Sequence, residues 1–258
     1  MPVIQVGGAK VDVEQSGAGR DLVLLHSLLA DRTVFNGVVP LLSRKRRVSL
    51  VSLPGYDESS PAGPAIEDYA DRIAGLISML RLPRETDVLG NGFGGFIAVA
   101  LAARHGGLFD RLIGAPALAA FPEPAKQPLR GLAERVAKEG MAGALDIAVQ
   151  RMFPRGFAEK NPVIVEERKR ALAKADPRCF QTACLALVKL DLTPVLQKIQ
   201  NSTLVMVGTE DATTPPALAR QLAAGIAGAK FVELAGCGHC PQLEDPRKFV
   251  AEVERFLG

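Results

Sequence analysis

The sequence predicts an α/β protein: a mostly parallel sheet flanked by helices, with an inserted helical cap. Three observations lead to this prediction. Short apolar runs alternate with helical segments of about a dozen residues in the first part of the chain. Residues 121–199 then show only helical periodicities, and strand patterns resume after them. We therefore expect one core built from residues 1–120 and 200–258, and a helical cap formed by residues 121–199.

The strands follow from two patterns. Two N-terminal runs alternate apolar and polar side chains on either side of Gly7 and Gly8, as the arms of a hairpin do. The later runs are continuous and apolar, which is typical of strands covered by helices on both faces. The hairpin strands are expected at residues 3–6 and 10–14, and the others at residues 22–25, 47–53, 87–89, 112–115, 204–207 and 231–234.

The helices follow from apolar side chains at helical spacing. Asp31 is the expected N-cap of the first helix, and Pro83 lies just beyond the end of the second. Within the cap, Leu129, Leu132 and Val136 are one such helical set. Helices of the core are expected at residues 31–43, 66–80, 96–102, 216–226 and 246–256.

Composition limits the class of protein. The 258 residues are 23% charged and 48% hydrophobic, with a net charge of +3, and fit one large globular domain. The basic run at residues 44–47 is better explained by a helix end and a solvated turn than by phosphate binding. No leader pattern and no apolar stretch of ~18 residues is present. We expect a cytoplasmic protein with a small-molecule substrate and with neither a nucleic-acid nor a membrane partner.

The stretch around Gly92 organises the prediction of function. A buried strand at residues 87–89 leads through Gly90-Asn91-Gly92-Phe93-Gly94 into an apolar helix. Strand, sharp turn and helix are the context of a G-x-S-x-G nucleophile elbow. Glycine is needed at 90 and 94 because side chains there would collide where strand and helix approach each other. The serine position holds Gly92, so the position of the nucleophile is vacant.

Two loops supply the other groups of a hydrolytic triad. Asp211 follows the strand at residues 204–207, and His239 follows the strand at residues 231–234. The carboxyl ends of parallel strands meet at one edge of the sheet, and the order elbow, acid, histidine is that of α/β hydrolases. We expect Asp211 to accept the Nδ1 proton of His239 and to leave Nε2 facing the elbow. A core histidine and a helix-capping aspartate are the alternative, which this order disfavours.

Backbone N–H groups are the expected anion-stabilising groups. The elbow places the N–H of Phe93 at a helix N-terminus, and the loop after the first core strand supplies a second donor, for which Leu28 is the candidate. Neither donor depends on the side chain at position 92. A developing oxyanion can therefore still be bound.

Metal binding and thiol chemistry are not expected. Cys237 and Cys240 have the spacing of metal ligands, but the chain has three histidines and no second cysteine pair at zinc-ribbon distance. Cys240 is also a poor candidate for the missing nucleophile, because it lies on a loop with no helix N-terminus to lower its pKa. We expect Cys179, Cys184, Cys237 and Cys240 to be reduced, buried thiols, with no disulfide, metal or cofactor.

Several stretches carry a resemblance to a known family. They are residues 26–31, 139–153, 175–177, 183–184, 208–215 and 239–246. On these the chain resembles the α/β-hydrolase superfamily and, within it, the 3-oxoadipate enol-lactonases. The resemblance implies an α/β-hydrolase fold, no cofactor, and a small, carboxylated lactone, ester or diketone bound under the cap.

The chain departs from the family pattern at three positions. Gly92 replaces the serine, Ser52 stands where an aspartate is usual, and Asp57 stands where a second glycine is usual. In the cap, the arginines are candidate carboxylate partners, although solvated helix faces are the expected role of each. These arginines are Arg151, Arg155, Arg168 and Arg178.

Three interpretations of the vacant position remain open. In the first, the protein is an enzyme that forms no acyl-enzyme: the missing hydroxymethyl group leaves room for a water, which His239 deprotonates. A hydrolase or a lyase-type reaction would fit. In the second, the protein is a catalytically inactive ligand-binding homologue, in which glycine relieves the strain of the elbow. In the third, Gly92 was introduced in place of the nucleophile of an enol-lactonase-like serine hydrolase, in order to trap a substrate.

Overall fold

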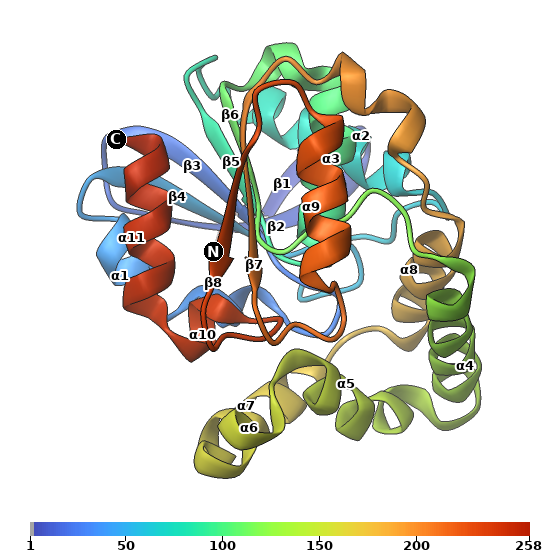
Figure 1. Ribbon diagram of the computed structural model, residues 1–258. Helices are drawn as coiled ribbons and strands as arrows, with labels where there is room; N and C mark the ends of the chain where they lie inside the picture. Colours follow the sequence, from blue (N-terminus) through green and yellow to red (C-terminus); the bar gives the residue numbers. More distant parts are fainter. Residues whose placement is uncertain (1–2) are drawn as a thin grey trace.

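A single twisted sheet runs through the computed structural model, which describes residues 3–258 (Figure 1). In this part of the chain the sheet has eight strands in the order β1-β2-β4-β3-β5-β6-β7-β8. β1 pairs antiparallel with β2 and β2 with β4, and all later neighbours are parallel. The predicted mostly parallel sheet is therefore confirmed. The strands are β1 (Val3–Val6), β2 (Ala9–Ser16), β3 (Arg20–Leu25), β4 (Arg46–Val51), β5 (Asp87–Gly90), β6 (Arg111–Gly114), β7 (Ser202–Gly208) and β8 (Lys230–Leu234).

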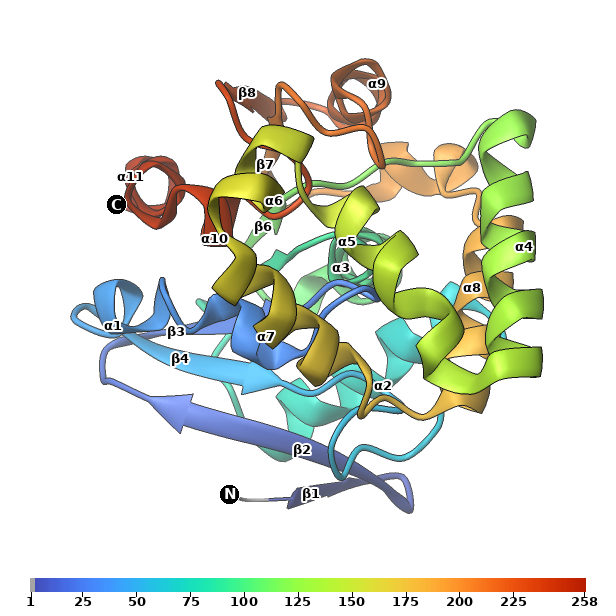
Figure 2. The same ribbon diagram turned by 90° about the horizontal axis from the view of Figure 1, so that it is seen from below.

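Helices cover both faces of the sheet. In Figures 1 and 2, α1 and α11 lie on one face, and α2, α3 and α9 lie on the other. None of the helices within residues 3–258 is both long and apolar enough to cross a bilayer. The helices of the core are η1 (Arg32–Phe35), α1 (Val39–Leu42), α2 (Ile66–Met79), α3 (Phe93–His105), η2 (Gly106–Leu108), α9 (Pro216–Gly225), α10 (Pro241–Glu244) and α11 (Pro246–Leu257).

The cap is a run of helices between β6 and β7. It contains no strand, and a single isolated bridge joins Ala120 to Asp191 where the chain leaves and re-enters the core. Figure 2 shows α4 and α8 side by side, with α5, α6 and α7 extending across the same end of the molecule. The cap helices are α4 (Glu123–Glu139), η3 (Gly140–Ala144), α5 (Leu145–Met152), α6 (Arg155–Lys160), α7 (Pro162–Leu172), α8 (Pro177–Lys189) and η4 (Thr193–Lys198).

The helix that follows the elbow is enclosed on all sides. Every residue of α3 from Phe93 to Ala102 is buried, because the helix lies between the sheet and α2. A helix that is apolar all round is the expected sequence for such a place. The small side chains of this stretch let the helix approach β3 and β5 closely. The N-terminus of α3 is therefore held rigidly above the sheet.

The expected helix at residues 31–43 is broken into two short ones. Asp31 does cap the first of them, η1, by accepting the N–H of Thr33 at 3.2 Å. A turn at Asn36 and Gly37 separates η1 from α1, and both of these residue types are poor helix formers. Apolar side chains of both short helices and of the turn are nonetheless buried, namely Val34, Phe35, Val38 and Leu42. The periodicity thus identified the buried face but not the break.

The basic run at residues 44–47 is not simply a solvated turn. Arg46 is buried, and its guanidinium lies 3.3 Å from carboxylate oxygens of both Asp87 and Glu254. Arg47 pairs with Asp21 on the neighbouring strand at 2.6 Å. The run therefore fastens β4 to its neighbours and to α11. Lys45, Arg46 and Arg47 each pair with a carboxylate of the protein.

Candidate active site

The elbow has the backbone that the sequence predicted. Gly92 has φ 54° and ψ −116°, a conformation that side chains other than glycine adopt only under strain. A Cβ atom on Gly90 would lie 2.1 Å from the carbonyl oxygen of Gly94, and one on Gly94 would lie 2.2 Å from that of Leu25. No side chain fits at such distances. The flanking glycines are therefore required by the close approach of β5, β3 and α3.

His239 and Asp211 meet in the interior. Nδ1 of His239 lies 2.9 Å from Oδ2 of Asp211, and both residues are 3% exposed. Asp211 also accepts the N–H groups of Thr213 and Thr214 and the Thr214 hydroxyl. Burial raises the pKa of Asp211, but His239 and the Thr214 hydrogen bonds outweigh burial, so the pKa lies below its usual range. The ionised Asp211 fixes the proton on Nδ1 and leaves Nε2 as an acceptor.

The loop that carries His239 is held from three sides. Its N–H donates to the carbonyl oxygen of Met152 in the cap at 3.1 Å, and its carbonyl accepts from Nδ2 of Asn91 in the elbow at 3.1 Å. Glu244 accepts the N–H groups of the residues on either side of His239, at 2.7 and 3.1 Å. Burial raises the pKa of Glu244 to about 7. The imidazole therefore has little freedom to turn away from the elbow.

The two expected oxyanion donors are free. Within residues 3–258, the N–H groups of Leu28 and Phe93 have no hydrogen-bond acceptor. The loop of Leu28 is shaped by the buried ring of His26, whose Nδ1 bonds the carbonyl oxygen of Ser27 at 2.9 Å and whose Nε2 accepts the N–H of Leu53 at 3.0 Å. Free N–H groups in a buried place are uncommon. Both residues line the pocket described below, so their N–H groups are available to an acceptor there.

The vacant position at Gly92 is not open space. A Cβ atom on Gly92 would lie 2.6 Å from Oγ of Ser27 and 2.8 Å from Nε2 of His239. These distances concern a Cβ atom and are also the lengths of hydrogen bonds that a water oxygen makes, so the expectation that the missing hydroxymethyl group leaves room for a water stays a prediction. A water in hydrogen-bonding contact with both has to lie on the pocket side of this point. No local pattern indicated this role for Ser27, which lies far from Gly92 along the chain.

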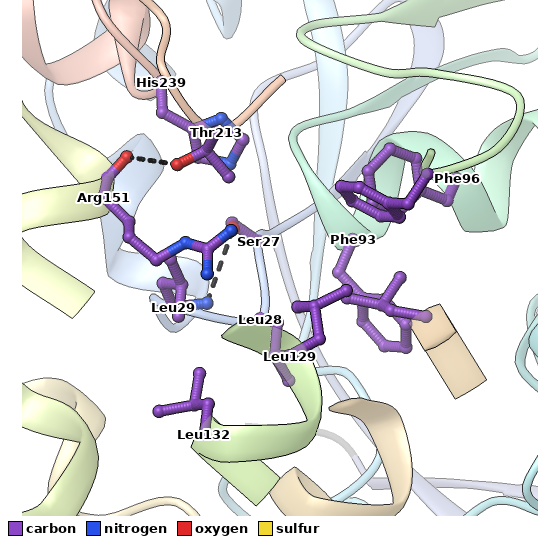
Figure 3. A pocket seen from close by; sticks show the side chains of 12 residues that line it. Ser27, Leu28, Leu29, Phe93, Phe96, Leu129, Leu132, Arg151, Thr213 and His239 are labelled. Atoms are coloured by element: carbon purple, nitrogen blue, oxygen red, sulfur yellow. Dashed lines mark hydrogen bonds between the residues drawn. The ribbon is translucent and has the colours of Figure 1, made fainter. Parts of the chain in front are cut away.

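A pocket opens beside these groups (Figure 3). The cavity proper measures about 30 Å³, and the hollow measures about 390 Å³ when the open solvent at its mouth is included. Its wall is mostly leucine and phenylalanine from the core and from α4 and α8 of the cap. The polar side chains in this wall come from three loops of the core, which carry Ser27, Thr213 and His239, and from α5, which carries Arg151. The lining residues are Ser27, Leu28, Leu29, Phe93, Phe96, Phe121, Leu129, Leu132, Arg151, Leu187, Thr213 and His239.

Of the four candidate arginines, one reaches the pocket. Arg151 extends its guanidinium into it (Figure 3), and no carboxylate within residues 3–258 forms an ion pair with it. Burial lowers the pKa of Arg151 from its usual value. Arg155 and Arg178 are exposed, as expected, whereas Arg168 is buried against Asp31 at 3.2 Å. The expectation of a solvated role is therefore wrong for Arg151 and Arg168.

The cysteines are buried and unpaired, as predicted. Burial raises the pKa of Cys237 to about 11 and that of Cys240 well above its usual value, so neither thiol ionises readily near neutral pH. Across residues 3–258, no three His, Cys, Asp or Glu side chains form a group that could hold a metal ion.

Comparison with known proteins gives consistent matches. The chain is 28% identical to 3-oxoadipate enol-lactonase 2 of Acinetobacter baylyi, over 92% of this chain and 88% of that one. It is 27% identical to a pimeloyl-[acyl-carrier protein] methyl ester esterase of Aeromonas hydrophila, over 96% and 99%. The crystal structure of the enol-lactonase from Burkholderia xenovorans LB400 superimposes with a TM-score of 0.93 at 29% identity, covering 99% of both chains.

The family follows from the length of the match as well as from the fold. The model of the alpha/beta hydrolase family matches residues 22–253, which include the elbow, the cap and the loops of Asp211 and His239. The strand order and the helices on both faces agree with this match. The chain belongs to the alpha/beta hydrolase family, with esterases and enol-lactonases among its homologues.

Proposed function

We propose that the protein hydrolyses a small, carboxylated ester, lactone or diketone without forming an acyl-enzyme at residue 92. His239 and Asp211 act as the general acid-base couple, and the N–H groups of Leu28 and Phe93 act as the oxyanion hole. One observation carries the proposal: a histidine fixed by a buried aspartate and two unpaired N–H groups line the same pocket. A protein that only binds a ligand has no need of this combination.

The chemistry would proceed in two steps. The substrate carbonyl oxygen accepts hydrogen bonds from Leu28 and Phe93, and a water attacks the carbonyl carbon while Nε2 of His239 takes one of its protons. The tetrahedral oxyanion then collapses and expels the alkoxide, enolate or carbanion. The leaving group takes the proton back from Nε2. Asp211 stabilises the imidazolium between the two steps and stays ionised.

The pocket supports the choice of substrate class. Its apolar wall fits a short acyl chain, and Arg151 gives it one cation for a carboxylate. The names of the similar proteins, an enol-lactonase and a methyl ester esterase, also point to ester bonds. We propose that the carboxylate lies against Arg151 and that the scissile carbonyl lies at the oxyanion hole. The cap thereby selects the substrate and the core carries out the reaction.

Without a serine at position 92, turnover should be modest. Loss of a triad nucleophile typically lowers turnover by about a millionfold, and the remaining groups keep roughly 10³ to 10⁴ over water. Enol esters and aryl esters have good leaving groups, so water can attack them without a covalent intermediate. We expect activity on such activated substrates and little on alkyl esters.

The test is His239→Ala assayed with mono-p-nitrophenyl glutarate, an activated ester that carries a carboxylate. Loss of a general base should lower kcat by about 10² to 10⁴ and leave the affinity for glutarate within about twofold. His105→Ala is the matched control, because His105 lies on the surface against Asp71. Wild-type turnover in the His239→Ala variant, with glutarate still bound, would contradict the enzyme proposal and favour a ligand-binding protein.

A further inference from the structure

Two polar side-chain atoms converge where the nucleophile would be attached. Oγ of Ser27 and Nε2 of His239 lie 2.6 and 2.8 Å from the Cβ position of Gly92, so they are separated by no more than the sum of these distances. No hydrogen bond joins the two atoms in residues 3–258. Both residues line the pocket. The space between them on the pocket side is therefore bounded by a hydroxyl and by a ring nitrogen that can accept a proton.

We infer that the Ser27 hydroxyl is a catalytic group that holds the attacking water together with Nε2 of His239. This inference rests on the proposed function and adds a residue to it. A water between them can donate one proton to Nε2 and the other to Oγ of Ser27. Its lone pair then points away from both, into the pocket. The role that a serine at position 92 would have is divided between a water and Ser27.

The position of Ser27 relative to the oxyanion hole supports this role. Ser27 directly precedes Leu28, whose free N–H is one of the two donors, and the buried ring of His26 fixes the carbonyl oxygen between them. A carbonyl oxygen bound by Leu28 and Phe93 therefore brings its carbon close to the water held by Ser27. Attack joins the water oxygen to this carbon, Nε2 takes one proton, and the Ser27 hydroxyl ends the step unchanged.

The arrangement favours a held water over attack by Ser27 itself. A serine nucleophile needs a base that accepts its proton, usually within hydrogen-bonding distance. Oγ of Ser27 forms no hydrogen bond to Nε2 and instead accepts the N–H of Leu29 at 3.4 Å. The hydroxyl is thus held in the loop as a partner for a water. No covalent bond to Ser27 is part of the proposal.

The experiment measures kcat and KM of Ser27→Ala with mono-p-nitrophenyl glutarate. Loss of the water's second partner should lower kcat about 10- to 100-fold and leave KM within about twofold, since the substrate contacts stay in place. Ser49→Ala is the matched control, because Ser49 is fully buried on β4 but lines no part of this pocket. It should keep wild-type kcat. A purely structural loss in Ser27→Ala would instead lower the fraction of active sites, which glutarate titration measures.

Two results would overturn the inference. One is wild-type kcat in Ser27→Ala while His239→Ala is inactive, which would leave the proposed function standing without Ser27. The other is a glutaryl adduct on the peptide containing Ser27, trapped by acid quench and found by mass spectrometry, which would make Ser27 a nucleophile. If His239→Ala retains full activity, the proposed function itself fails, so the two failures can be told apart.

Discussion

The elbow and the histidine loop face each other across the same pocket, but they differ in what fixes them. At His239 the backbone groups and the ring nitrogen Nδ1 all have partners, drawn from the cap, the elbow and Asp211, and Glu244 binds the N–H groups of the two neighbouring residues. At Gly92 the strained backbone of an elbow is kept, but its side chain is absent, and the side chains of Ser27 and His239 approach the place where it would begin. One loop has kept every contact for proton transfer. The other has kept its shape and the unpaired N–H of Phe93.

This difference shows which parts of the site can change independently. The elbow backbone is fixed by the approach of β5, β3 and α3, so its form does not depend on which residue occupies position 92. The position of Nε2 depends on contacts made by His239 and by its two neighbours in the loop. Substitutions at these two loops and at Arg151 of the cap should therefore have different effects, on stability, on turnover and on substrate recognition.

Gly92→Ser should have the largest effect. The positive φ and the close contacts with Ser27 and His239 should together lower the free energy of unfolding by about 3 kcal/mol, measured by urea unfolding. Ser27→Ala in the same chain removes the nearest contact and should recover about 1 kcal/mol. The double variant should also show a burst of p-nitrophenol, because the introduced hydroxyl can then form an acyl-enzyme with His239 as base.

The control for this prediction is Gly131→Ser on α4, where a Cβ atom meets nothing within 4 Å. Its stability should stay within about 0.5 kcal/mol of the wild type. Equal stability of Gly92→Ser and Gly131→Ser would mean that a side chain at the elbow is not strained.

Arg151→Gln should have the next largest effect, on recognition. A charged hydrogen bond is worth about 1.5 to 3 kcal/mol, so KM for mono-p-nitrophenyl glutarate should rise about 10- to 100-fold. KM for p-nitrophenyl valerate, which has the same chain length and no carboxylate, should change less than about threefold. Arg155→Gln, at an exposed position of the cap, is the control. Equal changes with both esters would show that Arg151 does not bind the carboxylate.

Glu244→Gln should have the smallest effect, seen as a pH dependence. Burial raises the pKa of Glu244 to about 7 in the folded protein, above the 4.5 of a free side chain. Between these two pH values the folded protein therefore binds the proton of Glu244 more tightly than the unfolded chain does. The wild type therefore loses stability as pH rises through about 7. Between pH 5 and pH 8, it should lose about 1 to 2 kcal/mol relative to the Gln variant.

Thermal unfolding of both proteins across this pH range measures the difference. Glu134→Gln, at an exposed position on α4, should follow the wild type at every pH. If the unfolding temperatures of the wild type and of Glu244→Gln differ by a constant amount across the range, Glu244 does not titrate there. The hydrogen bonds from the histidine loop to Glu244 would then be independent of pH.

Local patterns were sufficient for most of the fold. Apolar runs and periodicity placed the strands and most helices, because each pattern reflects which faces of an element are buried. The break at Asn36 and Gly37 was missed, since the apolar spacing continues across it. The helix α10 was missed because its four residues are too short to show a period.

The sequence by itself determined the strand-turn-helix at Gly92, the order of elbow, Asp211 and His239, and the helical insertion between strands. Each of these is encoded by residues close together in the chain. Only the tertiary structure decided that Ser27 approaches the place of the missing side chain and that Arg151 turns into the pocket. Those placements depend on contacts between segments far apart in sequence, whose distances no local pattern records.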